Sequence, residues 1–220
     1  MIKPIIKAVL PRPLRERLFL ARKKIRYSLR KYILKTATKG NAPLKIIVGA
    51  AETHQSGWLG TNEQWLDITK ETDWIHFFGH EKRISNIVAD RVFEHLTSEE
   101  ASIALDHMSK RLTDNGRIRI AVPDGCNPDK AYIRHVEIAG VGDDAGDHKQ
   151  LLNLNTLSAL INKAGLVPPH VEGFTKEGRL IQKSWFAEDG FIRRSRQNKS
   201  QEQWQFPDAA TSLIVNGVKK

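Results

Sequence analysis

The sequence is poor in cysteine, and this limits the kinds of site and compartment that suit it. Cys126 is the single cysteine among 220 residues. One thiol cannot build an internal disulfide framework or a zinc site of several thiolates. We therefore expect a cytoplasmic protein, in which Cys126 is an incidental loop residue.

Long apolar runs are also missing. The first ten residues are partly apolar, but Lys3, Pro4 and Lys7 interrupt them. The core of a signal peptide needs about seven or more apolar residues in a row, and a membrane-spanning helix needs about twenty. The start of the chain therefore predicts neither a secretory signal nor a spanning helix.

Acidic residues are nearly absent from the first forty positions. Residues 1–40 contain thirteen Lys or Arg and one acid, Glu16, whereas the remaining 180 residues contain 22 basic and 24 acidic side chains. The formal net charge of +10 is therefore +12 in this segment and −2 elsewhere. An overall basic balance favours nucleic acid as a partner. Here the balance belongs to one appendage and not to the main body of the chain.

The basic segment predicts an amphipathic helix from Pro13 to about Lys39. Proline suits the first turn, and apolar residues recur every three or four positions. They are Leu14, Leu18, Ala21, Ile25, Leu29, Tyr32 and Ile33. Two interpretations remain open: the stripe packs on the rest of the protein, or residues 12–35 lie on an anionic membrane surface at its inner face. Nucleic acid is the less favoured partner.

A breaker, Gly40-Asn41-Ala42-Pro43, follows this helix. Glycine and proline together indicate a loop, and they divide a helical extension of residues 1–40 from a domain of residues 44–220.

The clearest pattern in the domain spans residues 84–125. The apolar run from Ile84 to Ala89 predicts a buried strand, and Thr97 with Glu100 predicts a capping box at the start of a helix. A turn at residues 114–116 then leads to a second strand over residues 117–122. A strand–helix–strand unit of this length favours parallel strands, and ligands of such sheets bind where the strands end.

Three short segments resemble class I S-adenosylmethionine-dependent methyltransferases: Glu94-His95-Leu96, AVPDG at residues 121–125, and Gly146-Asp147-His148-Lys149. The likeness is closest to a bacterial group of predicted methyltransferases and covers about residues 44–220. It implies an α/β three-layer sandwich around a mostly parallel sheet. In that fold the strands over residues 84–89 and 117–122 are the fourth and the fifth. The strand over residues 212–218 is antiparallel and lies between the fifth strand and a sixth one over residues 166–171.

The resemblance also implies S-adenosylmethionine as the cofactor. Gly49-Ala50-Ala51 stands where relatives usually have Gly-x-Gly, and an alanine at the last position is costly if its φ is positive. The other cofactor-binding residues that it implies are Asn62 and Glu63 for the ribose, Asp67 for the adenine, and Ala89, Asp90 and Arg91 at the end of the fourth strand. Glu63 as a solvated loop acid and Asp67 as a helix cap remain alternatives.

Methyl transfer needs positioning and a base for the acceptor's proton. The candidates are Glu94, His95, Asp124 and His148, which lie on loops at the expected edge. Each has a structural alternative: Glu94 and His95 hold the loop, Asp124 shapes a turn, and His148 caps the next helix. The acidic loop over residues 140–149 matches neither a calcium loop nor a two-histidine helix motif, so we expect no metal site.

Two hypotheses for the function follow. The first is a methyltransferase acting on a small-molecule or glycan acceptor, which the resemblance implies to be a surface-glycan or lipid-linked saccharide precursor. The second is a catalytically silent adaptor with the same fold, which binds membrane or nucleic acid through the basic helix.

Overall fold

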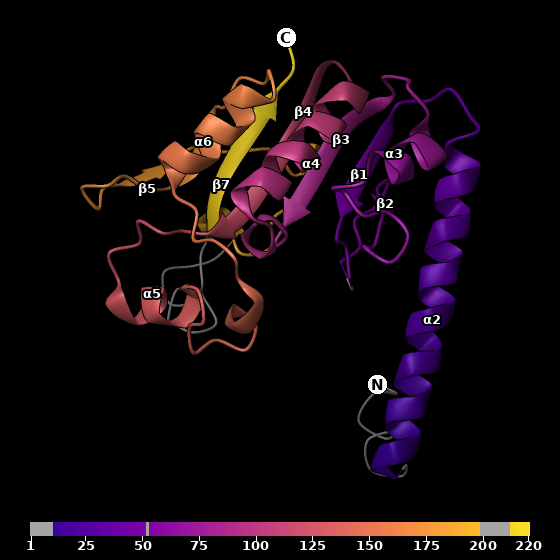
Figure 1. Cartoon of the computed structure of the whole chain (residues 1–220), viewed down its shortest axis with the longest axis horizontal. Helices are drawn as coiled ribbons and strands as arrows, with labels where there is room; N and C mark the ends of the chain where they lie inside the picture. Colours follow the sequence, from indigo (N-terminus) through magenta and orange to yellow (C-terminus); the bar gives the residue numbers. More distant parts are fainter. Residues whose placement is uncertain (1–10, 52, 199–211) are drawn as a thin grey trace.

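The computed structural model describes residues 11–51, 53–198 and 212–220. Within these ranges seven strands form one sheet in the order β2-β1-β3-β4-β7-β5-β6 (Figure 1). The strands are β1 (Leu44–Val48), β2 (Leu59–Gly60), β3 (Ile84–Asp90), β4 (Leu112–Pro123), β5 (His170–Phe174), β6 (Leu180–Gln182) and β7 (Ser212–Val218). The helices are α2 (Arg12–Ala37), α3 (Glu71–Phe78), α4 (Ser98–Arg111), α5 (Lys130–Val136) and α6 (Leu154–Lys163).

Strand directions confirm the expected sheet. β2, β1, β3, β4 and β5 run the same way, whereas β7 is antiparallel to both of its neighbours and β6 is antiparallel to β5. β7 lies between β4 and β5, as the resemblance implies. The near-continuous apolar runs Ile120–Val122 of β4 and Leu213–Val215 of β7, all buried, explain this position, because a strand buried on both faces must lie inside the sheet.

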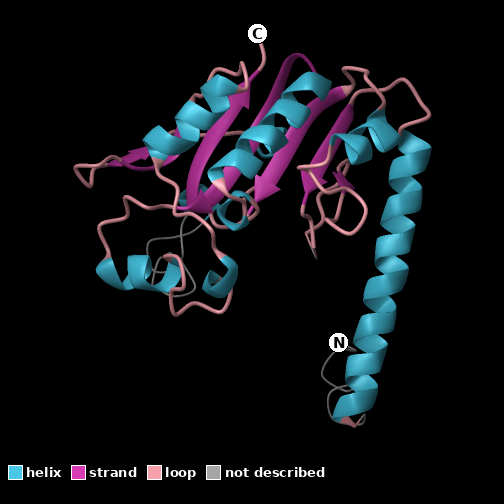
Figure 2. Ribbon diagram, viewed as in Figure 1, coloured by secondary structure: helices cyan, strands magenta, loops and turns pink. Residues whose placement is uncertain are grey.

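Helices α3, α4 and α6 cover one face of the sheet (Figure 2). The predicted capping box starts α4: Thr97 Oγ1 accepts from the Glu100 N–H, and the Glu100 carboxylate accepts from the Thr97 N–H at 2.7 Å. The helices bury Trp74, Met108 and Leu157 against the strands. This face therefore contains the larger part of the core.

The opposite face is covered by an irregular segment over residues 183–198, which includes the short turns η3 (Ala187–Asp189) and η4 (Arg196–Asn198). Trp185 and Ile192 pack there on Trp58 and Val88. The fold thus has three layers: the helices, the sheet, and this irregular segment.

Two boundaries differ from the sequence expectation. β4 begins at Leu112, which pairs with Ile84, and the predicted turn at residues 114–116 is a bulge inside the strand. The sixth strand of the expected order begins at His170 and not at residue 166. Pro168 and Pro169 lack the N–H groups that a ladder needs, so only an isolated bridge at Val167 precedes it.

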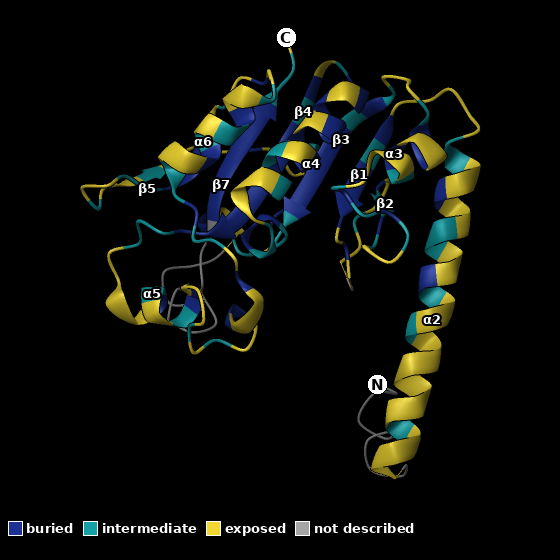
Figure 3. Ribbon diagram, in the orientation of Figure 1, coloured by how far each residue is buried: buried dark blue, intermediate teal, exposed yellow. Residues whose placement is uncertain are grey.

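The predicted basic helix is present as α2, but its apolar stripe does not pack on the domain. Most of α2 is exposed (Figure 3). Tyr27 and Leu34 are its buried residues, whereas Ile25 and Tyr32 are each 68% exposed. The first of the two interpretations is therefore wrong. None of the helices in the described ranges is long and apolar enough to cross a membrane.

Candidate functional site

The candidate site lies at the carboxyl edge of the parallel strands. The chain leaves β1 toward β2 on one side, while β3 lies on the other, so the strand order reverses between β1 and β3. Such a switch point leaves a crevice in which ligands of open α/β sheets bind. The register places Val48 beside Ala89, so the loops after β1 and β3 begin at the same level.

A cavity of about 510 Å³ opens at this switch point. It brings together residues from the ends of three strands: Gly49 after β1, Asn62 and Glu63 after β2, and Arg91 after β3. Leu66 and Ile68 contribute apolar wall, and Asp67 also lines the cavity. Five of the nine residues expected to bind a cofactor thus converge on one space.

The other four expected cofactor residues do not line this cavity. The side chains of Ala50 and Ala89 are buried in the two hydrophobic clusters of the sheet. Asp90 and Ala51 adjoin the lining residues Arg91 and Gly49 in the sequence but do not line the cavity themselves. These four residues shape the backbone of the two loops.

The turn after β1 has a positive φ at two positions, one of which is not a glycine. Gly49 has φ +58, and a Cβ there would lie 2.8 Å from Val92 Cγ2. Ala51 has φ +40, so the alanine stands in the conformation that glycine tolerates better. Arg30 of α2 supports the turn, since its guanidinium donates to the carbonyls of Ala51 at 2.6 Å and Thr53 at 3.0 Å. The sequence pattern of α2 gave no sign of this contact.

Asp67 stabilises its own loop. Its carboxylate accepts from the Thr69 N–H and hydroxyl and pairs with Lys70 at 3.0 Å. The N-cap of α3 is Lys70, so the alternative in which Asp67 caps that helix is wrong.

A cluster of three titratable side chains adjoins the cavity: Glu94 and His95 from the turn η1 (Phe93–His95), and His148 from the acidic loop. One potential ligand atom from each lies within 4.8 Å of the others, and the two imidazole rings are 5.1 Å apart. The backbone holds the two loops together, because the N–H of Lys149 donates to the Glu94 carbonyl at 2.8 Å. The fold therefore joins the separated EHL and GDHK segments.

Burial shifts the pKa values of two side chains in this cluster, Glu94 and His148. Glu94 is 1% exposed, and desolvation raises the pKa of its carboxyl to about 7, although Arg91 Nε lies 3.1 Å away. His148 is 4% exposed, and burial lowers the pKa of its imidazole. With Nδ1 2.8 Å from the Val136 carbonyl, the neutral ring donates there and leaves the Nε2 lone pair free. No described group bonds Nε2.

The arrangement at His148 favours a base over a helix cap. Asn153 caps α6 through its own side chain, so the capping alternative for His148 is wrong. His95 is partly exposed, lines the cavity and pairs with Asp147 at 3.0 Å.

The same three side chains are a potential metal-binding set, since three protein ligands suffice for an open zinc site. However, the Arg91 guanidinium already provides a positive charge at the Glu94 carboxylate. A second cation at that oxygen would be repelled. We therefore interpret the cluster as a group that handles protons, and the expectation of no metal site stays a prediction.

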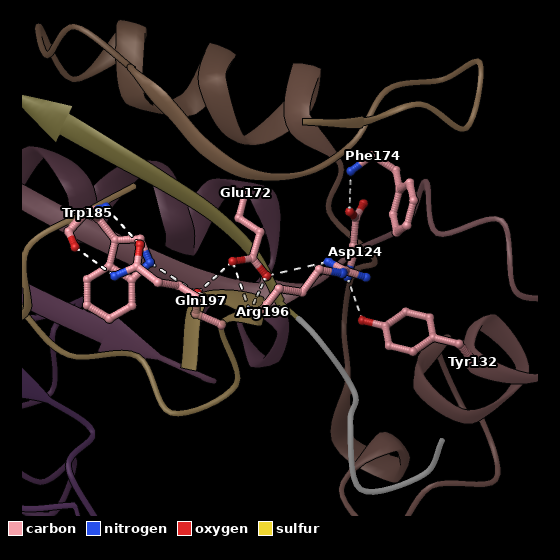
Figure 4. Close-up of polar contacts among 8 residues, drawn as sticks. Asp124, Tyr132, Glu172, Phe174, Trp185, Arg196 and Gln197 are labelled. Atoms are coloured by element: carbon pink, nitrogen blue, oxygen red, sulfur yellow. Dashed lines mark hydrogen bonds and ion pairs between the residues drawn. The ribbon is translucent and has the colours of Figure 1, made fainter. Parts of the chain in front are cut away.

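Asp124 is a structural residue (Figure 4). Its carboxylate is buried and accepts from the N–H groups of Cys126 at 2.9 Å and Phe174 at 2.7 Å, while its own N–H donates to the Tyr132 hydroxyl. Both oxygens are occupied by backbone donors, so Asp124 ties the end of β4 to the end of β5. This corresponds to the turn alternative and removes Asp124 from the catalytic candidates.

A buried polar network beside Asp124 fixes the irregular third layer. Glu172 of β5 accepts from the Ser195 hydroxyl at 2.6 Å and from the Arg196 N–H at 2.9 Å, and Gln197 bonds the backbone of Trp185 in both directions (Figure 4). No sequence pattern indicated this network, because Glu172 lies 23 and 24 residues from Ser195 and Arg196, and Trp185 lies 12 residues from Gln197.

A second cavity of about 440 Å³ adjoins the first. His95 and Asp147 line both cavities, and Asp143, Asp144 and Gly146 complete the second. His95 therefore borders both spaces, whereas His148 lines neither and lies behind it, with its ring 5.1 Å from that of His95.

Replacing Glu94 with glutamine is expected to change how stability depends on pH. A carboxyl whose pKa is raised from 4.5 to about 7 stabilises the fold below pH 4.5, and this contribution is lost as the pH rises toward 7 and beyond. Glutamine resembles the protonated acid and loses nothing. We therefore expect the difference in the free energy of unfolding, Glu94→Gln minus unmodified protein, to increase by about 2–3 kcal/mol from about pH 5 to pH 8. Denaturant titrations at each pH measure this difference.

The exposed Glu137→Gln provides the matched control, with no expected difference across this pH range. Parallel pH curves for Glu94→Gln and the unmodified protein would contradict a raised pKa at Glu94.

Several solved structures to which this chain is similar are methyltransferases. A SAM-dependent methyltransferase from Archaeoglobus fulgidus is 12% identical, with a TM-score of 0.45 over 90% of this chain and 94% of that chain. A 1,6-didemethyltoxoflavin-N1-methyltransferase from Burkholderia thailandensis is 12% identical, with a TM-score of 0.42 over 96% and 92%. Magnesium protoporphyrin IX methyltransferase from Synechocystis with bound SAH is 10% identical, with a TM-score of 0.40 over 89% and 84%. No protein-family model and no curated protein matches the sequence.

Similarity at this level does not determine activity, ligand or acceptor.

Proposed function

We propose that this protein is an S-adenosylmethionine-dependent methyltransferase. The observation that carries the proposal is the cavity at the β1/β3 switch point, next to a buried imidazole with a free lone pair. Its volume of about 510 Å³ is within the range of about 300–1,000 Å³ typical of small-molecule sites.

The lining of the cavity suits a nucleoside cofactor. Asn62 and Glu63 offer oxygen atoms to the hydroxyls of a ribose, and Leu66 with Ile68 offers apolar surface to an adenine ring. Gly49 also lines the cavity, and because it has no side chain a ligand can approach its backbone closely. When bound, the cofactor supplies a methyl group on a positively charged sulfur, ready for attack by a nucleophile.

His148 is the proposed general base. Its neutral ring accepts the proton of an acceptor hydroxyl at Nε2 while Nδ1–H remains bonded to the Val136 carbonyl. Glu94, with its pKa near 7, lies beside the imidazoles and can take part in passing that proton on. His95, held by Asp147, is the proposed positioning residue between the two cavities.

We propose a saccharide acceptor in the second cavity, as a precursor of a surface glycan or a lipid-linked saccharide. Asp143, Asp144 and Asp147 present carboxylate oxygens there, and these accept hydrogen bonds from sugar hydroxyls. The proposed location is the cytoplasm, with peripheral contact at the inner face of the membrane.

Calorimetry with S-adenosylmethionine tests this proposal. One equivalent should bind with a dissociation constant in the micromolar range, and a screen of nucleotide sugars, lipid-linked glycans and RNA should then identify an acceptor. The absence of binding at millimolar cofactor would exclude the enzyme.

One observation favours the second candidate, a catalytically silent adaptor. Ala51 holds φ +40 in the turn that would contact the cofactor, a conformation that costs about 1–2 kcal/mol for a residue with a Cβ. The same calorimetry separates the two candidates, since the adaptor requires no cofactor.

A further inference from the structure

Helix α2 presents two opposite faces. Tyr27, Arg30 and Leu34 face the domain, where Leu34 joins the main core and Arg30 bonds the turn after β1. At 3.6 residues per turn these three positions lie on one side of the helix. Arg83 also bonds the carbonyl of Thr38 just after the helix at 2.6 Å. The C-terminal half of α2 is thus fixed to the domain.

The opposite face is apolar and exposed. Its residues follow one another at spacings of four, three, four, four and three, which keeps them within one stripe. They are Leu14, Leu18, Ala21, Ile25, Leu29 and Tyr32. At 1.5 Å per residue the stripe is about 27 Å long. The N-terminal half of α2 extends away from the sheet with almost every residue exposed (Figure 3).

Basic residues flank the stripe on both sides. Arg15 and Arg22 each come one residue after a stripe residue and lie along one edge of the stripe. Arg17 and Lys24 each come one residue before a stripe residue and lie along the other edge. Over Arg12–Ala37 there are ten Lys or Arg and one acid, Glu16, giving a net charge of +9.

This charge pattern decides between possible occupants of the stripe. A second copy of the helix would place basic flanks against basic flanks, in parallel or antiparallel pairing, and like charges there oppose association. A nucleic acid would satisfy the charges and leave the apolar stripe in water. An anionic lipid surface satisfies both, because the apolar stripe enters the headgroup boundary while the flanking cations meet lipid phosphates and carboxylates.

We propose that the stripe of α2 is a docking surface for an anionic lipid bilayer. Because Arg30 and Arg83 bind α2 to the domain, docking would hold the cofactor cavity in a fixed orientation to the membrane. The proposal does not depend on methyltransferase activity, because its readout is vesicle binding alone.

Vesicle flotation of the full-length protein tests it. Binding to phosphatidylcholine vesicles with about 30% phosphatidylserine should exceed binding to pure phosphatidylcholine at least tenfold at about 0.1 M salt. The variant Ile25→Gln/Leu29→Gln should lose at least tenfold in affinity, and Ile138→Gln/Val141→Gln, at exposed apolar positions outside α2, should lose nothing. Arg22→Gln/Lys24→Gln should also weaken binding, whereas Lys163→Gln/Lys176→Gln, which removes the same charge elsewhere, should not.

Any of four results would overturn the proposal. They are no binding to anionic vesicles, equal binding to neutral and anionic vesicles, unchanged binding by Ile25→Gln/Leu29→Gln, and a dimer in solution that this variant dissociates. Tight RNA binding that Arg22→Gln/Lys24→Gln abolishes, without vesicle binding, would assign the face to nucleic acid. Circular dichroism at matched concentration should show that every variant keeps its helix content, since all the changed side chains are exposed.

Discussion

Replacing His148 with alanine should lower the turnover of methyl transfer by a factor of about 10²–10⁴ and leave the affinity for S-adenosylmethionine within about twofold. The base acts on the proton of the acceptor, and its ring lies outside the residues that line the cofactor cavity. Turnover is measured with the acceptor that the screen identifies, and affinity by calorimetry.

His107→Ala is the matched control. His107 is also buried, and its Nδ1 lies 3.2 Å from the carbonyl of Ile68, but it belongs to α4 and not to the cluster. This variant should lose stability and keep its turnover per folded molecule. Equal losses of turnover in the two variants would mean that His148 has a structural role.

The pH profile provides an independent measure of the base. Burial lowers the pKa of His148, so the neutral base persists into more acidic solution than an exposed histidine would allow. The acid limb of kcat/KM should therefore fall below the ordinary histidine value of about 6.5. A limb above that value would assign the titration to another group, such as Glu94.

Gly49→Ala should weaken S-adenosylmethionine binding at least about a hundredfold while the protein stays folded. Two causes act together: φ +58 is unfavourable for alanine, and its Cβ would lie 2.8 Å from Val92 Cγ2. Either the turn or the Val92 side chain must shift, and both line the cavity. Calorimetry measures the affinity, and a denaturant titration verifies the fold.

Gly178→Ala isolates the backbone effect, because Gly178 has φ +75 in the hairpin between β5 and β6, far from the cavity along the sheet. It should cost stability without changing cofactor affinity. Adding Val92→Ala to Gly49→Ala should recover only part of the affinity, since the contact is relieved and the backbone strain remains. A folded Gly49→Ala protein that binds normally would contradict the assigned position of the cofactor.

Local patterns predicted the elements of this fold because their causes are local. Thr97 and Glu100 are three residues apart and form the capping box that starts α4, and the apolar run ending at Ala89 is a buried strand. The position of β7 between β4 and β5 was also expected, but from family resemblance and not from spacing. The strand expected from residue 166 begins at His170. Pro168 and Pro169 have no N–H group to donate to a neighbouring strand, so apolar character alone did not place its start correctly.

The sequence by itself determined most of the helices and strands, the edge of the sheet at which the candidate site lies and the amphipathic character of α2. Tertiary structure decided which candidates meet and which do not. Glu94 and His148 are over fifty residues apart in the sequence and belong to one cluster. Both carboxylate oxygens of Asp124, in contrast, accept hydrogen bonds from the N–H groups of Cys126 and Phe174. The stripe of α2 faces away from the domain because Arg30 and Leu34 find better partners on the other face, and helical periodicity carries no information about where those partners lie.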